Sequence, residues 1–568
     1  MQRSRLAFLL AAAFAAACGE SAGPVESWIE IRNSRPWMEV GDTDRFVADV
    51  REGEAPTPGP IVPNVEFTWS SSDPSVVSID AGSGAAVALE NGTSQIEVCA
   101  LGGCSGWDIT VINPIAGVAV MPDSVTLLPY GQFNLTAIPT DADGEPVVEI
   151  ESPVYWLFEN EMIWSSEHPD VAVVNLPSGP PWLVEGVARG TTQVTAQFRE
   201  FSGSATVTVV LIDLTDISAG GEHTCALADT GEPYCWGSVF FQPDLEAGRW
   251  TPEFVPRGTA EPLNLVALAS GEAHACGLTA AGTAYCWGSR FSAALGRGEW
   301  VEPIEPLGTP VPVAGNGQYA TVTTGGIHTC ATGVRGELYC WGSNPFGQLG
   351  ITSTETCGYG VGKSGEVQMG PCERAPTAVT DHPTYAAVSA GGNHTCGLVA
   401  DGTAFCWGLI GTHESPDTVR VPGDHPFTSI ASGSGVTCGL TASGDAYCWG
   451  SNSNGLGDGS TTESDEPVLV AGGHTFAQLS VNAAACGVTS DGGLYCWGSN
   501  DPSVAGPTPT RIGDTITWAS VDVGGIHACG MTVEGVAYCW GSNHTGALGV
   551  SGEDWTSEPM RVIGQIEP

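Results

Sequence analysis

The sequence predicts an all-β chain in which a seven-bladed β-propeller follows two small β-sandwiches. Three observations favour this fold. Between residues 225 and 539, a cysteine followed by nine residues and Cys-Trp-Gly occurs seven times. Successive copies begin 42 to 66 residues apart, a spacing that predicts a solenoid or a propeller. The first 212 residues lack this pattern and instead contain two stretches, each near the hundred-residue size of a small sandwich, that share a Trp-Ser-Ser segment.

Each of the seven copies predicts a β-hairpin. In the second copy, two β-prone runs between Cys276 and Cys286 flank Gly282, where a tight reversal needs a positive φ. The matching glycines of the other copies are Gly231, Gly336, Gly402, Gly444, Gly492 and Gly535. A hairpin centred on this glycine places its two cysteines opposite each other on neighbouring strands, within reach of a disulfide.

Cysteine pairing accounts for eighteen of the 19 cysteines. The hairpin pairs are Cys225 with Cys235, Cys276 with Cys286, Cys330 with Cys340, Cys396 with Cys406, Cys438 with Cys448, Cys486 with Cys496, and Cys529 with Cys539. Cys99 and Cys104 bracket a short glycine-containing turn, and Cys357 and Cys372 bracket the longest insertion between copies. For the seven hairpin pairs a metal site is the weaker alternative, because zinc ligands are usually two to four residues apart and the hairpin cysteines are ten apart. Disulfides in this number indicate an oxidising compartment outside the cytosol.

The N-terminus predicts an export signal. Arg3 and Arg5 precede an apolar run from residue 6 to residue 17 that is too short to span a membrane as a helix. The segment ending Ala15-Ala16-Ala17-Cys18 resembles the lipobox of bacterial lipoproteins, with Ala15 in place of the usual leucine. This resemblance implies a signal peptide over residues 1–18, lipidation of Cys18, and a tether over residues 19–26. Gly19 favours the outer membrane over the inner one. Ordinary cleavage after Ala17 is the alternative.

Two segments follow the tether, at residues 27–112 and 114–212. The first contains Trp69-Ser70-Ser71-Ser72-Asp73-Pro74, and the second contains Trp164-Ser165-Ser166-Glu167-His168-Pro169, followed later by Gly190-Thr191-Thr192. Both segments resemble group 2 bacterial immunoglobulin-like domains. This resemblance implies two sandwiches that hold the remaining chain away from a membrane, or that contact cell-wall or surface components.

Residues 213–568 hold the seven copies. The last copy contains Gly524-Gly525-Ile526-His527-Ala528-Cys529, then Tyr538-Cys539-Trp540-Gly541-Ser542-Asn543, then Gly546-Ala547-Leu548-Gly549. This pattern resembles the regulator-of-chromosome-condensation repeat, which implies a seven-bladed β-propeller. The copies depart from it at Val436 and Ala484, which replace the histidine, and the Gly-x-Leu-Gly turn is missing from the first, fourth and sixth copies.

The sequence predicts no catalytic residue, metal site or cofactor. A histidine recurs in five copies, and a ring of histidines could bind a metal, but buried histidines that tie a turn of each copy are the favoured interpretation. The repeated tryptophans are expected between blades. The segment before Lys363-Ser364 resembles a phosphate-binding loop, but Cys357 stands where its first glycine is required, so we predict no nucleotide.

Charge restricts the partners. The chain carries 18 basic and 63 acidic residues, a formal net charge of −45, and Lys363 is its single lysine. Because nucleic-acid binding depends on neutralising phosphates with Lys and Arg, we predict no nucleic-acid partner. Such a field favours cationic or neutral partners, and a generally acidic surface suited to solubility explains it equally well.

The long stretches between the first copies predict a binding surface. They contain Trp250, Trp300, Tyr359 and Arg374, residue types that are common in interfaces, and we expect them to cluster on one rim sector. The alternative is that these side chains pack against their own loops.

The predicted function is that of a non-enzymatic binding protein in the cell envelope. In this interpretation an outer-membrane lipoprotein, facing the periplasm or the cell surface, uses its propeller to recognise a protein or glycan, and it contacts the membrane through its lipid anchor only. The guanine-nucleotide exchange associated with the repeat family is not expected of an exported chain. Two alternatives remain, namely an extracellular polymer-degrading hydrolase or lyase, and a purely structural envelope protein.

Overall fold

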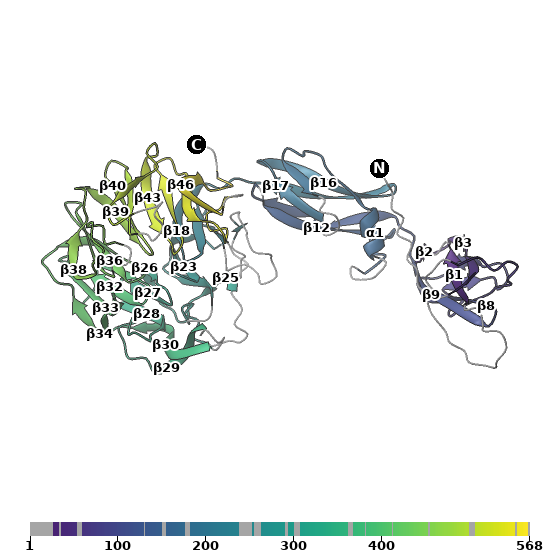
Figure 1. Cartoon of the computed structure of the whole chain (residues 1–568), viewed down its shortest axis with the longest axis horizontal. Coiled ribbons are helices and arrows are strands. Elements are labelled where there is room, and N and C mark those ends of the chain that lie inside the picture. Colours follow the sequence, from purple (N-terminus) through teal and green to yellow (C-terminus); the bar gives the residue numbers. More distant parts are fainter. Residues whose placement is uncertain are drawn as a thin grey trace. The chain divides into compact units, whose positions relative to one another are not determined.

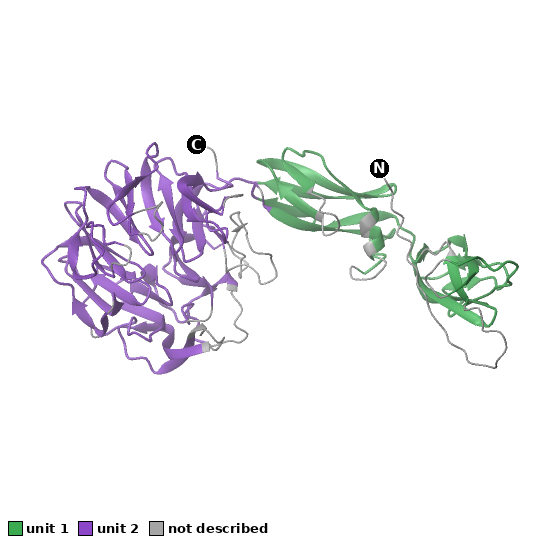
Figure 2. Cartoon of the chain, viewed as in Figure 1, with its two compact units in different colours: residues 1–127, 132–209 green, residues 128–131, 210–568 purple. Residues whose placement is uncertain are grey.

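The chain forms two compact units in a computed structural model (Figure 2). Unit 1 comprises residues 1–127 and 132–209, and unit 2 comprises residues 128–131 and 210–568. The structure describes residues 27–32, 36–53, 59–129, 131–149, 155–175, 182–237, 253–254, 263–289, 293–299, 307–361, 367–380, 382–411, 413–451, 455–498, 506–550 and 554–565. Almost all of its regular structure is β, as predicted.

The first half of unit 1 consists of three small sheets. The larger sheet has the order β2 (Trp37–Glu39), β9 (Gly103–Ile112), β8 (Gly92–Ala100) and β5 (Thr68–Ser71). The others are β3 (Thr43–Arg45), β7 (Ala85–Ala88) and β6 (Val77–Ile79), and the pair β1 (Ser27–Arg32) and β4 (Val47–Glu52). The core between them contains Trp69, Val77 and Val98, all buried.

The second half of unit 1 repeats this plan with two four-stranded sheets. One has the order β10 (Gly117–Met121), β12 (Gln132–Thr140), β15 (Trp182–Gly186) and β14 (Ala172–Asn175). The other has the order β11 (Ser124–Leu127), β17 (Phe201–Val209), β16 (Gly190–Phe198) and β13 (Ile163–Ser166). The helix α1 (Tyr155–Glu161) packs its Phe158 into their shared core. No helix in the described part of the chain has both the length and the apolar character needed to cross a membrane.

The Trp-Ser-Ser segments have the same local role in both halves. In the first half, the buried Ser94 hydroxyl lies 2.8 Å from Ser71 Oγ and accepts a hydrogen bond from the N–H of Asp73 at 3.1 Å. In the second half, Thr192 Oγ1 accepts the N–H of His168 at 2.9 Å. A hydroxyl on the following long strand therefore holds the turn after each Trp-Ser-Ser segment.

Unit 2 is an all-β propeller whose described strands form seven antiparallel sheets, called sheets 1 to 7 in chain order (Figure 1). Sheet 1 contains β18 (Leu214–Ala219), β19 (His223–Ala228), β20 (Pro233–Gly237) and β21 (Glu253–Phe254). Sheet 2 contains β22 (Leu265–Ser270), β23 (His274–Thr279), β24 (Ala284–Gly288) and β25 (Leu307–Pro312). Sheet 3 contains β26 (Tyr319–Thr324), β27 (His328–Gly333), β28 (Leu338–Ser343), β30 (Val367–Ala378) and β29 (Glu355–Val361). Sheet 4 contains β31 (Ala387–Ala390), β32 (His394–Leu398), β33 (Ala404–Ile410) and β34 (His413–Arg420).

The remaining three sheets keep the same strand order. Sheet 5 contains β35 (Phe427–Ser432), β36 (Val436–Thr441), β37 (Ala446–Gly450) and β38 (Ser464–Leu469). Sheet 6 contains β39 (Phe476–Val481), β40 (Ala485–Thr489), β41 (Leu494–Trp497) and β42 (Thr510–Ile512). Sheet 7 contains β43 (Trp518–Val523), β44 (His527–Thr532), β45 (Ala537–Ser542) and β46 (Trp555–Arg561).

The hairpin between the second and third strands of each sheet carries the predicted cysteine pair. In all seven hairpins the two cysteines are direct cross-strand partners with Cα atoms 4.1 Å apart. From sheet 1 to sheet 7 these partners are Cys225 with Cys235, Cys276 with Cys286, Cys330 with Cys340, Cys396 with Cys406, Cys438 with Cys448, Cys486 with Cys496, and Cys529 with Cys539.

The turn glycine of these hairpins has the predicted positive φ, for example 78° at Gly282. A residue with a Cβ would be strained there. The sequence therefore specifies where each hairpin reverses, and the reversal brings the two cysteines together.

Sheets 1 and 7 lie against each other although they are distant in sequence. The Ser218 hydroxyl on β18 donates to Asp522 Oδ2 on β43 at 3.1 Å. An isolated parallel bridge also pairs Ile212 with Gln565. The first and last sheets therefore close the ring.

Candidate functional site: the axial channel of the propeller

The first strands of the seven sheets and the loops after them line a cavity of about 650 Å³. The lining consists mainly of glycine, alanine, serine and small β-branched residues. Its acidic members are Glu222, Glu272 and Asp522, and none of the described residues that line it is lysine or arginine. This channel is therefore a concave, polar candidate binding site in unit 2.

Glycines after the first strands of every sheet except sheet 6, which has Asn482 and Ala483 there, allow the sheets to approach at the channel. A Cβ built on Gly325 would lie 2.3 Å from the carbonyl oxygen of Gly391 in the next sheet, and one on Gly221 would lie 2.3 Å from that of Glu272. Where a side chain would stand, backbone hydrogen bonds join neighbouring sheets instead. Gly221 N–H donates to Gly271 O at 3.0 Å, and Gly326 N–H donates to Gly391 O at 3.1 Å. The Gly-Gly pair of the repeat is therefore a requirement of close backbone contact.

Further along the channel, hydroxyls join neighbouring sheets. Ser218 Oγ accepts the N–H of Ser270 at 2.9 Å, and Ser389 Oγ accepts the N–H of Ser432 at 2.9 Å. In sheet 7 the equivalent residue is Asp522, which accepts the N–H of Ala219 at 2.8 Å. A buried carboxylate thus takes the place of a hydroxyl where the ring closes.

The carboxylates of this region have raised pKa values. Burial raises the pKa of Asp522, although hydrogen bonds from Ser480, Ala219 and Ser218 oppose the shift. On β18, desolvation by the surrounding walls and repulsion by Asp522 raise the pKa of Asp216 to about 6, even though part of its surface is exposed. On the loop after β22, desolvation and then repulsion by Glu222 raise the pKa of Glu272. Carboxylates that repel one another favour a cation or a cationic group nearby.

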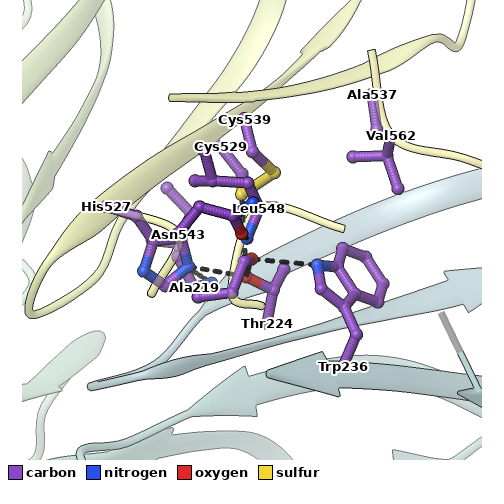
Figure 3. The surroundings of a disulfide bond; sticks show 12 residues. Ala219, Thr224, Trp236, His527, Cys529, Ala537, Cys539, Asn543, Leu548 and Val562 are labelled. Carbon is purple, nitrogen blue, oxygen red and sulfur yellow. Dashed lines mark hydrogen bonds between the residues drawn. A yellow bond between two sulfur atoms is a disulfide. The ribbon is translucent and has the colours of Figure 1, made fainter. Parts of the chain in front are cut away.

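Buried histidines connect neighbouring sheets, as Figure 3 shows for the junction between sheets 7 and 1. His527 Nε2 lies 2.6 Å from Thr224 Oγ1, which donates to the carbonyl oxygen of Ala547 at 2.8 Å. The Trp236 indole N–H donates to the same carbonyl at 2.9 Å. Since the threonine hydrogen is used by the carbonyl, the histidine carries its proton on Nε2.

The same His–Thr pair occurs at three other junctions. Its members are His274 and Thr329 at 2.9 Å, His328 and Thr395 at 2.8 Å, and His394 and Thr437 at 2.8 Å. Burial lowers the pKa of His274 and His394 to about 4 and that of His328 and His527 to about 3. Burial also lowers the pKa of His223. The expected burial of the histidines is confirmed, but four of them bond a threonine of the next sheet instead of a turn of their own copy, and these partners were not foreseen.

The Gly-x-Leu-Gly turn and the Ser-Asn that precedes it also have structural roles. Asn543 Oδ1 accepts the N–H of Leu548 at 3.0 Å, and its side-chain amide donates to Val550 O at 3.1 Å. This bonding presents the Ala547 carbonyl to Thr224 and Trp236 of sheet 1 (Figure 3). The recurring residues therefore build the scaffold, which leaves the channel and the rim for function.

The structure places the two remaining cysteine pairs outside the repeat hairpins. Cys357 and Cys372 join β29 to β30 in sheet 3, with Cα atoms 5.8 Å apart. Cys99 and Cys104 face each other across the β8–β9 turn of unit 1, with Cα atoms 4.0 Å apart. All nine predicted pairs are thus at bonding distance.

The predicted rim surface is only partly described. Arg374 lies on β30, where its Nη2 donates to Thr356 O at 2.9 Å and its Nε lies 3.8 Å from Glu355 Oε2. These contacts are within one hairpin, which agrees with the alternative that the side chain packs on its own loop. Tyr359 lies in β29, and its side chain, Trp250, Trp300 and Cys18 lie outside the described residues.

Family models identify the repeats. A model of the regulator of chromosome condensation (RCC1) repeat matches residues 214–238, 265–290, 385–412 and 427–456, and a second model of this repeat matches residues 335–398. These segments lie in sheets 1 to 5. The matched segments of this all-β propeller are therefore similar to RCC1 repeats.

Curated relatives share part of this propeller. The chain is 27% identical over 210 residues to the ultraviolet-B receptor UVR8 of Arabidopsis thaliana, covering 35% of this chain and 43% of UVR8. It is 26% identical over 265 residues to the regulator of chromosome condensation of Homo sapiens, covering 36% of this chain and 63% of that protein. The solved structure of Kap60 bound to yeast RCC1 (Prp20) has a chain that is 20% identical, with a TM-score of 0.49, covering 62% of this chain and 84% of that one. The matches thus span about two fifths to two thirds of these curated relatives.

Proposed function

We propose that the protein is an exported, lipid-anchored binding protein whose propeller recognises a protein or glycan partner in the cell envelope or outside the cell. The observation that carries this proposal is the axial channel, whose charged lining is acidic throughout. A rigid ring with a polar, concave opening and few charged residues has the character of a binding site. The relatives support a binding role, because their names include a receptor and a regulator.

The channel favours a partner that presents a cationic group or a neutral hydrogen-bonding group. Glu222 and Glu272 stand on the loops after the first strands of sheets 1 and 2, and Asp522 lies on the first strand of sheet 7. A lysine, an arginine or an amino sugar would relieve their mutual repulsion. The rim residues Trp250, Trp300, Tyr359 and Arg374 are proposed as a further contact surface.

The proposed architecture has four parts. Cys18 carries the lipid, residues 19–26 form a tether, residues 27–112 and 114–212 are immunoglobulin-like spacers, and residues 213–568 are a seven-bladed propeller. The repeated hydroxyl contacts of Ser94 and Thr192 support a duplicated sandwich. The location is proposed as the outer membrane, with the propeller facing the periplasm or the cell surface. Loss of acyl labelling in Cys18→Ala would test the anchor.

The binding role is tested by photo-crosslinking in intact cells. A photoreactive residue replaces Glu272 at the channel or, as the control, the exposed Asp424 on the loop after β34. We expect one envelope or secreted protein, or one glycan, to be trapped from position 272 and not from position 424. Binding of that partner should weaken at least about tenfold in Glu222→Gln/Glu272→Gln and stay unchanged in Glu414→Gln/Asp424→Asn. Equal trapping at both positions would contradict the proposal.

A hydrolase or lyase acting on an extracellular polymer remains the second candidate. The raised pKa values of Asp216 and Glu272 are the observation in its favour, because a general acid at neutral pH needs such a shift. Asp522, however, accepts hydrogen bonds from Ser218, Ser480 and a backbone N–H, which is the bonding of a scaffold residue. Release of sugars from envelope polymers that is lost in Asp216→Asn would favour the enzyme.

A further inference from the structure

The β8–β9 hairpin of unit 1, labelled in Figure 1, ends in a tight turn. It carries a disulfide whose surroundings differ from those of the others. Its strands pair in register from Gly92↔Val111 to Ala100↔Gly103, so Cys99 and Cys104 lie opposite each other next to the turn. Leu101 and Gly102 form the turn with φ of 51° and 84°. Nine backbone pairs therefore hold the two cysteines opposite each other, whether or not their sulfurs are bonded.

Exposure separates this pair from every other disulfide. Cys104 is exposed and Cys99 is half-buried, on the solvent face of β8 and β9. The sixteen cysteines of unit 2 that form disulfides are at most 1% exposed. Because thiol–disulfide exchange requires the attacking thiolate to reach a sulfur, a reductant in solution can reach the hairpin pair first.

An acidic side chain completes a group of possible ligands. The carboxylate of Glu97 and the sulfurs of Cys99 and Cys104 lie within 4.8 Å of one another. Glu97 and Cys99 are two residues apart on β8, so their side chains lie on the same face. The residue opposite Glu97 is Gly106, which has no side chain to cover the carboxylate and the two sulfurs. No other group of three or more His, Cys, Asp and Glu side chains in the described part of the chain meets the same spacing.

We propose that the reduced hairpin is a site for a thiophilic divalent cation, with Zn²⁺ as the expected ion, and that the disulfide closes this site. A dithiol reductant converts the Cys99–Cys104 bond into two thiols and is itself oxidised to a disulfide. The cation then displaces one proton from each thiol and binds two thiolates and the Glu97 carboxylate. Two sulfurs, one carboxylate oxygen and one water satisfy the tetrahedral preference of zinc. Because two protons leave, binding strengthens as pH rises.

The test uses the full chain with Cys18→Ala, so that the hairpin supplies the free thiols. After brief treatment with dithiothreitol without denaturant, alkylation and peptide mass spectrometry should find Cys99 and Cys104 modified and the other pairs intact. Cobalt titration of the reduced, desalted protein should then give a sulfur-to-cobalt charge-transfer band that saturates at one ion per chain. Zinc should abolish the band, and the oxidised protein should not produce it.

Matched variants separate a built site from two reactive thiols. Glu97→Gln should weaken cobalt binding at least about tenfold, because loss of even an outer-shell partner costs 10–100-fold. Asp108→Asn removes an equal charge from the same exposed face, opposite Gln95, and should leave binding unchanged. The proposal is overturned if Cys99→Ser/Cys104→Ser gives the same band, if Glu97→Gln binds as the parent does, or if the propeller disulfides are reduced first.

Discussion

At the junction between sheets 3 and 4, His328 Nε2 lies 2.8 Å from Thr395 Oγ1. At the junction between sheets 5 and 6, the two corresponding positions hold Val436 and Ala485, which pack in one apolar cluster. Between sheets 6 and 7 they hold Ala484 and Ala528, in the same cluster. At these two junctions both members of the polar pair are replaced, and the ring closes with either kind of contact.

Hydrogen-bond energetics explain why both members change together. A buried hydrogen bond contributes about 1 kcal/mol net, whereas one partner left alone costs about 1–3 kcal/mol. Replacement of both partners by apolar groups of suitable shape is nearly neutral. The junction between sheets 1 and 2, with His223 and Ala275 at these positions, is the mixed case.

The largest loss of stability is expected at the close backbone contact between sheets 3 and 4. Gly325→Ala would place a Cβ 2.3 Å from the carbonyl of Gly391 and 2.5 Å from His328 Cε1. Because the carbonyl is backbone of the next sheet, we expect a loss of about 3 kcal/mol in the free energy of unfolding, measured by denaturant titration. Gly506→Ala is the control, since no atom lies within 4 Å of its Cβ. Equal stability of the two variants would mean that the sheets can move apart.

A smaller loss of stability should distinguish the junctions with a His–Thr pair from the apolar junctions. Thr395→Val removes a hydroxyl that bonds both His328 and the carbonyl of Gln348, and it should cost about 2 kcal/mol of unfolding free energy. The double variant His328→Val/Thr395→Ala copies the junction between sheets 5 and 6 and should cost less than the sum of its single variants. A double-mutant cycle measures the difference, and additive losses would refute the idea of a coupled pair.

The pH dependence of the free energy of unfolding should also distinguish a junction with a His–Thr pair from an apolar junction. Burial lowers the pKa of His328 from 6.5 to about 3, so the unfolded chain gains a proton below pH 6.5 while the folded protein does not. Stability therefore falls as pH falls from 6.5 towards 3, by up to about 1.4 kcal/mol per pH unit for each such histidine. Chemical unfolding at pH 4.5 and 6.5 should show a weaker pH dependence in the His328→Val/Thr395→Ala variant. The raised pKa of Asp216 acts in the opposite direction, and it is common to both proteins, so it cancels.

The smallest effect on stability is expected from introducing a His–Thr pair at the junction between sheets 5 and 6, which has an apolar contact instead. Val436→His/Ala485→Thr should change the unfolding free energy by less than about 1 kcal/mol, because a new buried hydrogen bond offsets the desolvation of its partners. Val436→His alone should cost more than the double variant. The reverse order would show that sheet 6 has no room for the threonine.

The repeat pattern predicted most of the scaffold, because its signals are local in sequence. The spacing of Cys276 and Cys286 and the glycine between them define a hairpin without knowledge of the rest of the chain. The threonine partners were missed because each belongs to the copy after its histidine. A signal was present, since the copies with Val436 and Ala484 are followed by Ala485 and Ala528 in place of threonine.

The channel could not be predicted in the same way. Ser218 and Asp522 come from the first and last copies, and they meet only when the ring closes. Single carboxylates among 63 acidic residues give no signal of that meeting. The contacts of the rim residues could not be predicted either. Arg374 lies in β30, outside the repeated hairpins, and the repeat pattern does not determine the conformation of that insertion.

The short sequence separation of the cysteine pairs affects how the chain acquires its covalent bonds. Partners are 5, 10 or 15 residues apart in all nine cases, and the bonds never cross one another along the chain. Each thiol can meet its correct partner as soon as the intervening hairpin forms, before the next copy is needed. Oxidation can thus proceed in the order of synthesis, and only the final docking of sheet 7 on sheet 1 must wait for the C-terminus.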